Sequence, residues 1–79
     1  TYLNNLGTMY HTQSRFDLAQ KYYEEALDIR IKTLGESDPK VGRVLLNLAV
    51  LYRKTGQEDK ARDARERARR ILGMPHGQW

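Results

Sequence analysis

The chain matches itself at an offset of 42 residues, and this internal repeat constrains the fold more than any other feature. The segment LNNLGTMY at residues 3–10 returns as LLNLAVLY at residues 45–52. Over residues 3–29, nine of 27 positions are identical to the residue 42 later, and most of these are apolar, small or aromatic. A period in this range marks a solenoid, in which one supersecondary unit stacks on copies of itself. Solenoids present an extended surface to a partner.

Composition is consistent with a soluble helical domain, because 39% of the residues are hydrophobic and 30% are charged. No apolar run approaches the roughly 20 residues that a transmembrane helix needs, and no signal peptide opens the chain. We therefore expect a cytoplasmic protein. The absence of cysteine excludes disulfides and thiolate metal ligands. Since the first residues already follow a helical pattern, we expect the chain to be a piece of a longer array.

Apolar and small residues recur at helical spacing in four stretches, which predicts two antiparallel helix pairs. The first stretch ends at a break at Ser14-Arg15, and the second covers residues 16–34. The third begins at Pro39 and ends near residues 55–56, and the fourth covers about 58–72. Loops of a few residues make consecutive helices antiparallel neighbours. No segment has the pattern of a strand, so the predicted fold class is all-α.

Residues between the second and third stretches supply helix end signals. Gly35 is expected as a left-handed cap at the C-terminus of the second helix. Asp38 is a candidate N-cap, and Pro39 follows it at the first helical position, where its missing N–H is not needed. These residues predict a sharp boundary between two helix pairs.

The repeated motif resembles a known family. Leu-x-x-Leu-Gly-x-x-Tyr over residues 3–10, followed after a short turn by Ala19 and Ala26, is similar to the tetratricopeptide repeat. That repeat usually has about 34 residues. Here the additional residues lie in a longer second helix and in the connector LGESDP at residues 34–39, a variant that resembles the repeats of kinesin light chains. The resemblance implies an α-solenoid of two stacked helix-turn-helix repeats in a right-handed superhelix.

The same resemblance predicts how the chain is divided. The expected parts are residues 1–34 as the first repeat with its first helix truncated at the N-terminus, residues 35–42 as the connector and the start of the next helix, residues 43–72 as the second repeat, and residues 73–79 as a flexible tail.

The last helix departs from the first repeat in its apolar pattern. Arg65 and Arg69 stand where the first repeat has Tyr23 and Leu27. Because solenoids need a polar outer helix at their ends, we predict that this helix is a cap or nearly so. Ser14 also replaces the glycine usual at the turn within a repeat.

Candidate binding residues lie on the stripe opposite the predicted core. In tetratricopeptide domains the first helix of each pair lines a concave groove, so the resemblance places this stripe there. Asparagine can both donate and accept hydrogen bonds, so Asn5 and its repeat equivalent Asn47 could hold the backbone of an extended peptide. Leu46 and Val50 would supply an apolar floor, with a basic rim around it. The predicted peptide-binding residues are Asn4, Asn5, Thr8, Arg43, Leu46, Asn47, Val50, Arg53 and Lys54.

Kinesin light chains bind cargo peptides that carry tryptophan among acidic residues. The resemblance therefore implies a non-catalytic interaction module of an adaptor or scaffold, with a groove for short acidic, aromatic-anchored peptides. We predict no enzyme, because no nucleophile motif, phosphate-binding loop or metal-ligand spacing occurs. Cofactors, metals, small-molecule substrates and membranes are not expected as partners.

Two alternatives remain open. The chain could be a C-terminal capping or self-association element of a longer array, with no ligand of its own. About three repeats are usually needed for a stable solenoid, so we expect the isolated fragment to dimerise or exchange helices. The Arg-rich last helix could instead bind nucleic acid, but acidic residues alternate with its arginines and no aromatic side chain is present for base stacking.

Overall fold

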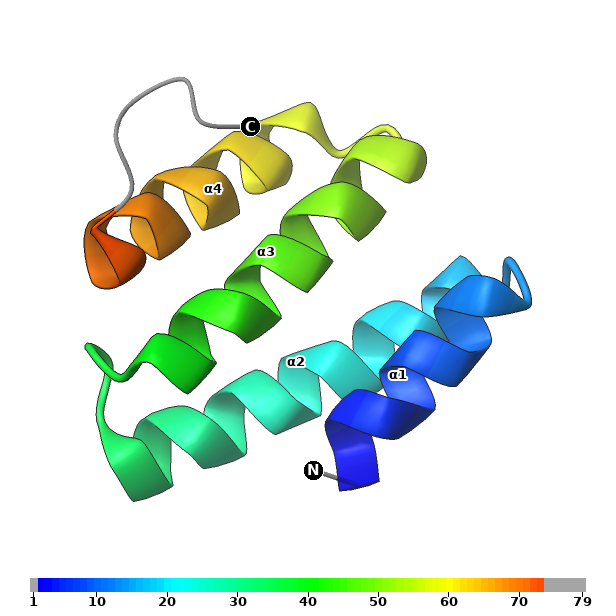
Figure 1. The fold of residues 1–79 in the computed structure, drawn as a ribbon. Coiled ribbons are helices and arrows are strands. Elements are labelled where there is room, and N and C mark those ends of the chain that lie inside the picture. The colour runs from blue at the N-terminus through cyan, green and yellow to red at the C-terminus, as the bar shows by residue number, and fades with distance from the viewer. Residues whose placement is uncertain (1, 74–79) are drawn as a thin grey trace.

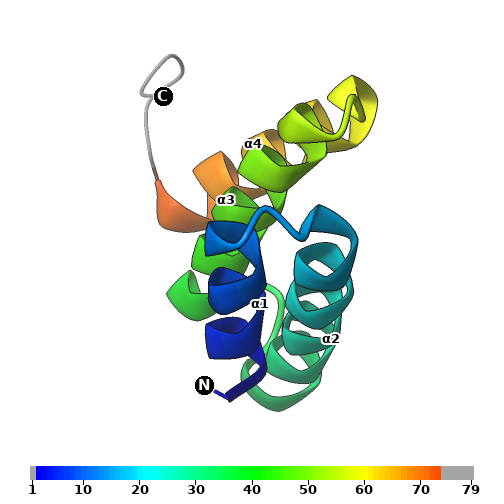
Figure 2. The ribbon, with the colours of Figure 1, turned by 90° about the vertical axis from the view of Figure 1, so that its right-hand side faces the viewer.

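The computed structural model describes residues 2–73, which form four helices with no strand among them (Figure 1). The helices are α1 (Tyr2–Thr12), α2 (Phe16–Leu34), α3 (Pro39–Lys54) and α4 (Glu58–Leu72). Helix α1 packs against α2, and α3 packs against both α2 and α4 (Figure 2). The predicted all-α fold of two stacked helix pairs is therefore confirmed. Residues 74–79, most of the expected tail, lie outside the described residues.

The boundary between the two pairs follows the sequence signals in part. The Asp38 carboxylate accepts a hydrogen bond from the Lys40 backbone N–H at 2.9 Å, and Pro39 is the first residue of α3. Gly35 donates its N–H to the Ile31 carbonyl at 2.9 Å, but its φ of 91° and ψ of 158° are not left-handed helical. The expectation of a left-handed cap at Gly35 is wrong, because its ψ lies far from the left-handed helical value and the connector turns only after it, at residues 36–37. Gly73, after α4, adopts that left-handed cap.

Helix α3 is the centre of the hydrophobic core. Eight of its 16 residues are buried, whereas α1 buries only Gly7. The difference arises because α3 has a packed neighbour on two sides and α1 on one. The buried apolar side chains of the other helices are Ala19, Tyr23, Ala26, Ala61, Ala64 and Ala68.

Helices α1 and α2 approach each other closely at Gly7. A β-carbon at this position would lie 2.6 Å from the ring of Tyr23, so only glycine accommodates the ring there. The Tyr23 side chain is 2% exposed, and its hydroxyl lies 2.9 Å from the Thr8 hydroxyl. Tyr23 therefore fills the space between the two helices of the first repeat.

A polar network joins α2 to the second pair. The Tyr52 hydroxyl donates to the Glu24 carboxylate at 2.7 Å, and the Gln57 amide donates to Gln20 Oε1 at 3.0 Å. Gln20 in turn donates to Glu24 at 3.3 Å. Burial, the hydrogen bond and the Glu24 charge raise the pKa of the Tyr52 hydroxyl, which therefore remains a donor at physiological pH.

The turns within the two repeats make a matched pair for a stability test. Ser14 has φ of 60° and its repeat equivalent Gly56 has φ of 77°. This conformation disfavours any residue with a β-carbon, and no atom lies within 4 Å of a β-carbon placed at Gly56. We expect Ser14→Gly to raise the free energy of unfolding by about 0.5–1 kcal/mol and Gly56→Ser to lower it similarly. Urea denaturation followed by circular dichroism measures both, and changes of the same sign would contradict the strain argument.

Candidate functional site

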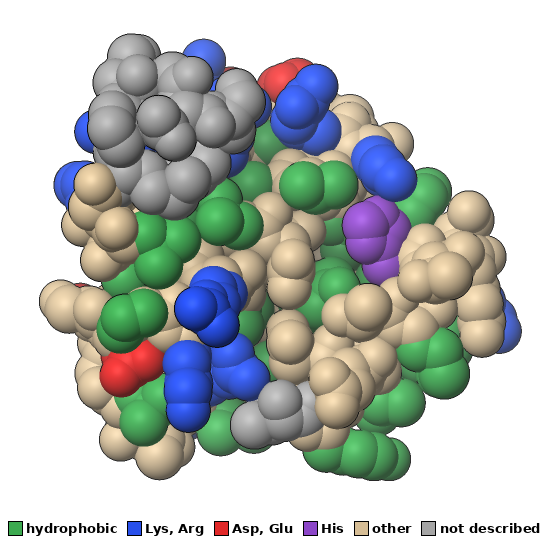
Figure 3. All heavy atoms as spheres, in the orientation of Figure 1, with side chains coloured by type: hydrophobic (Ala, Val, Ile, Leu, Met, Phe, Trp, Pro, Cys, Tyr) green, Lys and Arg blue, Asp and Glu red, His purple; other side chains and the backbone are tan. Residues whose placement is uncertain are grey.

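Helices α1 and α3 present a common face with a basic character. Figure 3 shows Lys and Arg side chains gathered at two places on it, one over the N-terminal half of α3 and one near its C-terminal end. His11 of α1, the only histidine within residues 2–73, lies within reach of the charge of Lys54 at the C-terminal end of α3. Each basic group borders a hollow, described in turn below.

The first hollow lies between α1, the end of α2 and the start of α3. It has a volume of about 430 Å³ and is lined by Asn4, Arg30, Lys40, Arg43, Leu46 and Asn47. The structure therefore brings four of the predicted residues together. Arg30 and Lys40 were missed by the sequence reasoning, since Arg30 lies on the second helix of the pair. The Arg30 guanidinium donates to the Lys40 carbonyl at 3.3 Å, which fixes it beside the hollow.

Of the three predicted residues of α1, only Asn4 lines the first hollow. Asn4, not Asn5, lines the hollow with Asn47, and Asn5 is exposed outside it. The Asn4 Oδ1 atom is buried without a hydrogen-bond partner within residues 2–73. Thr8 is exposed, but its hydroxyl already contacts the Asn4 carbonyl at 3.1 Å and the Tyr23 hydroxyl. Asn4 and Asn47 are consequently the two amides that line the first hollow.

A second hollow opens between α3 and α4 at the other end of the face. Its apolar part, about 250 Å³, is lined by Leu46, Ala49, Val50, Arg53 and Arg65. Its polar part, about 320 Å³, is lined by Val50, Arg53, Lys54 and Glu58. The Val50 side chain is 45% exposed, and Arg53 and Arg65 form no ion pair within residues 2–73. An apolar floor with guanidinium groups at its edge suits an apolar ligand group next to an acidic one.

The two repeats differ in the side chain that fills the space between their helices, and this difference explains the second hollow. In the first repeat the Tyr23 ring lies over Gly7 and closes the space between the helices. The repeat equivalents are Arg65 and Ala49, so the second repeat supplies no ring to fill the same space. Sequence comparison of the two repeats showed the change from tyrosine to arginine, but not that it leaves a cavity.

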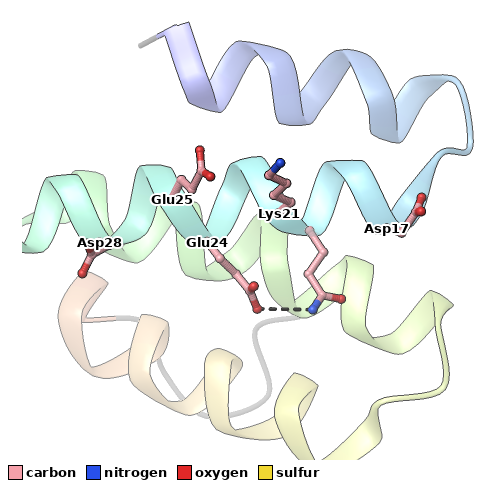
Figure 4. Close-up of a pocket in the computed structure, with 6 residues that line it drawn as sticks. Asp17, Lys21, Glu24, Glu25 and Asp28 are labelled. Carbon is pink, nitrogen blue, oxygen red and sulfur yellow. Dashed lines mark hydrogen bonds between the residues drawn. The ribbon is translucent and has the colours of Figure 1, made fainter.

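Charge is divided between the two sides of the molecule. Figure 4 shows the side of α2 that carries Asp17, Glu24, Glu25 and Asp28, with Lys21 among them, around another hollow of about 430 Å³. The face formed by α1 and α3 has mainly basic residues around its hollows. An acidic ligand would therefore be attracted to the α1–α3 face and repelled from this side of α2.

Comparison with known proteins identifies the family of the chain. Residues 1–73 match the Tetratricopeptide repeat family, to which the chain therefore belongs. Repeats of this class generally mediate contacts between proteins. The chain is 35% identical to "Protein KINESIN LIGHT CHAIN-RELATED 1" of Arabidopsis thaliana over 71 residues, covering 90% of this chain and 12% of the relative. It is 39% identical to "Protein KINESIN LIGHT CHAIN-RELATED 3" of the same plant over 67 residues, covering 85% of this chain and 10% of the relative.

These matches confirm the resemblance to tetratricopeptide repeats of the kinesin light chain type. The chain spans only about a tenth of the length of either relative. Within residues 2–73, no helix has both the length and the apolar character needed to cross a membrane.

Protonation of His11 should oppose folding. Burial and the positive charge of Lys54 lower the pKa of His11 below its ordinary value of 6.5, so the folded protein binds this proton less readily than the unfolded chain. The free energy of unfolding should fall as the pH drops below about 6.5, until His11 is protonated in both states. Urea denaturation at pH 7.5 and 5.5 should show a smaller loss for His11→Gln than for the wild type. Equal losses would show that His11 titrates normally in the folded protein.

Proposed function

We propose that the face formed by α1 and α3 binds a short acidic peptide segment with an aromatic anchor. The chain then acts as a non-catalytic interaction module in a cytoplasmic adaptor or scaffold protein. The observation that carries this proposal is the first hollow, where two asparagine side chains meet Arg43 and Leu46. This set combines hydrogen-bonding groups for a peptide backbone with a cation for an acidic side chain.

The second hollow supplies the place for the anchor. It lies at the other end of the same face and shares Leu46 with the first hollow. An aromatic ring would fill the space that Tyr23 fills in the first repeat, and a neighbouring carboxylate would pair with Arg53 or Arg65. The resemblance of the relatives to kinesin light chains favours a peptide ligand, but the two hollows alone determine the residues assigned here.

A capping role without a ligand is the second candidate function. It is favoured by the polar character of α4, whose Arg62 and Arg69 pair with Asp59 and Glu66 of the same helix. These two ion pairs within α4 reduce the need for a partner on that part of its surface. The binding experiment below separates the two candidates.

Fluorescence anisotropy with three labelled ten-residue peptides tests the proposal. One peptide carries tryptophan among aspartates and glutamates, the second has alanine for tryptophan, and the third has lysine for each acid. We expect selective binding of the first peptide, weakened by salt because the basic rim contributes. Arg43→Ala should weaken this binding about tenfold, the loss of one charged contact. Arg70→Ala, which removes an exposed charge that lines neither hollow, is the matched control and should bind as the wild type does.

The anchor site can be closed without disturbing the rest of the face. The double variant Ala49→Gly with Arg65→Tyr reproduces the arrangement of Gly7 and Tyr23 in the first repeat, so it should fold and fill the second hollow. We expect this variant to lose the preference for tryptophan over alanine. Wild-type affinity in the double variant would contradict the anchor site, and no selective binding by the wild type would support the capping role.

A further inference from the structure

A further hollow lies outside the α1–α3 face, where the connector between the two repeats approaches the C-terminal end of α4 (Figure 1). The two sides meet because α3 begins beside the end of α4, so a β-carbon at Gly42 would lie 2.8 Å from the Leu72 side chain. The hollow shares no residue with either part of the proposed peptide site. It has a volume of about 250 Å³ and is lined by Glu36, Ser37, Arg67, Arg70 and Ile71.

Two arginines give this hollow a positive charge. Arg67 and Arg70 are three residues apart, so they lie on the same side of α4. Neither of them forms an ion pair within residues 2–73, whereas Arg62 and Arg69 of the same helix each do. Glu36 lines the hollow from the connector and is also without an ion pair in the described part of the chain. The hollow thus carries an excess of one positive charge.

Ser37 lines the same hollow from a turn of the connector. The turn covers residues 36–37, and the Asp38 backbone N–H donates to the Gly35 carbonyl across it at 3.4 Å. The Ser37 side chain is exposed, and its hydroxyl has no hydrogen-bond partner within residues 2–73. An exposed, unbonded hydroxyl on a surface turn is accessible to a modifying enzyme.

We propose that Ser37 is a phosphorylation site and that its phosphate binds Arg67 and Arg70. A protein kinase supplies the group from ATP. The Ser37 Oγ atom forms a bond to the γ-phosphorus, the bond between this phosphorus and the β–γ bridging oxygen breaks, ADP leaves, and the hydroxyl proton passes to the catalytic base of the kinase. The phosphate brings close to two negative charges and three acceptor oxygens. Guanidinium groups bind such oxygens with charge-assisted hydrogen bonds.

The modification links the two repeats outside their hydrophobic contact. The connector continues from α2, whereas Arg67 and Arg70 belong to α4, and α2 and α4 have no extensive contact within residues 2–73. A phosphate between them therefore adds a link that the unmodified chain lacks. Because the arginines lie in the last two turns of α4, this link opposes fraying of that end of the helix.

Chemical synthesis of the full 79-residue chain with phosphoserine at position 37 tests the proposal. We expect the melting temperature to rise by about 4 °C, and amide exchange in the last turn of α4 to slow about fivefold, relative to the unmodified chain. Phosphorus NMR follows the second ionisation of the phosphate. Its midpoint should lie at lower pH than in the double variant Arg67→Gln with Arg70→Gln, because the guanidinium groups stabilise the dianion. An unchanged or lower melting temperature, or equal midpoints, would overturn the proposal.

The double variant also separates binding by the arginines from the effect of a negative charge near the N-terminus of α3. Most of the rise in melting temperature should be lost in the phosphorylated double variant. Arg62→Gln, which removes a charge paired with Asp59, is the matched control and should retain the rise. A rise in the double variant as large as in the wild type would overturn the link to α4.

Inorganic phosphate added to the unmodified chain distinguishes a covalent phosphate from a bound ion. At about 10 mM phosphate we expect the same melting temperature as in sodium chloride of equal ionic strength, because Glu36 opposes a free anion and the two arginines are not deeply buried. A specific rise that is lost in the double variant would assign the hollow to a free anion and overturn the modification.

Discussion

The contact between α2 and α3 determines how the rest of the molecule is arranged. It is the only extensive contact between the two helix pairs within residues 2–73, because each pair otherwise packs internally. Apolar packing supplies most of its stabilisation, since the buried side chains of α3 have neighbours on both sides. The hydrogen bond from Tyr52 to Glu24 adds direction, because it forms only when the two helices are in one register.

The register of α2 against α3 determines how the residues of the candidate binding face on α1 and α3 lie relative to one another. Asn4 belongs to α1, and Asn47 and Arg43 belong to α3, so their distance apart depends on how the first pair sits on the second. The second hollow also depends on α3, through its packing against α4. Leu46 and Val50 of α3 line this hollow on one side, and Arg65 of α4 lines it on the other. A rigid contact between the pairs therefore preorganises the first hollow, whereas the packing of α4 on α3 shapes the second hollow.

Periodicity in the sequence predicted the four helices, their order and the core, because those features depend on local apolar spacing. It also identified Arg65 as a departure from Tyr23. It did not predict the cavity beside Arg65, since a cavity depends on the volumes of side chains from two helices. The conformation of Gly35 was also mistaken, because the direction of the connector is set by where α3 packs.

The candidate site was predicted less well than the fold. The stripe on α1 contained both Asn4 and Asn5, and repeat equivalence favoured Asn5 with Asn47. The structure instead places Asn4, and not Asn5, in the lining of the first hollow together with Asn47. Arg30 was missed because it lies on the second helix of the pair, whereas the resemblance pointed to the first helices, and its guanidinium lines the first hollow beside Lys40.

A double-mutant cycle of Tyr52→Phe and Glu24→Ala, measured by urea denaturation of the full chain, tests the contact that this account treats as central. The hydrogen bond should give a coupling energy of about 1 kcal/mol, because Phe keeps the packing of the ring and removes only the donor. The changes in the free energy of unfolding caused by the two single substitutions should therefore not sum to the change caused by the double substitution. Strict additivity would show that the hydroxyl and the carboxylate do not interact, and that the register of the two helix pairs is set without them.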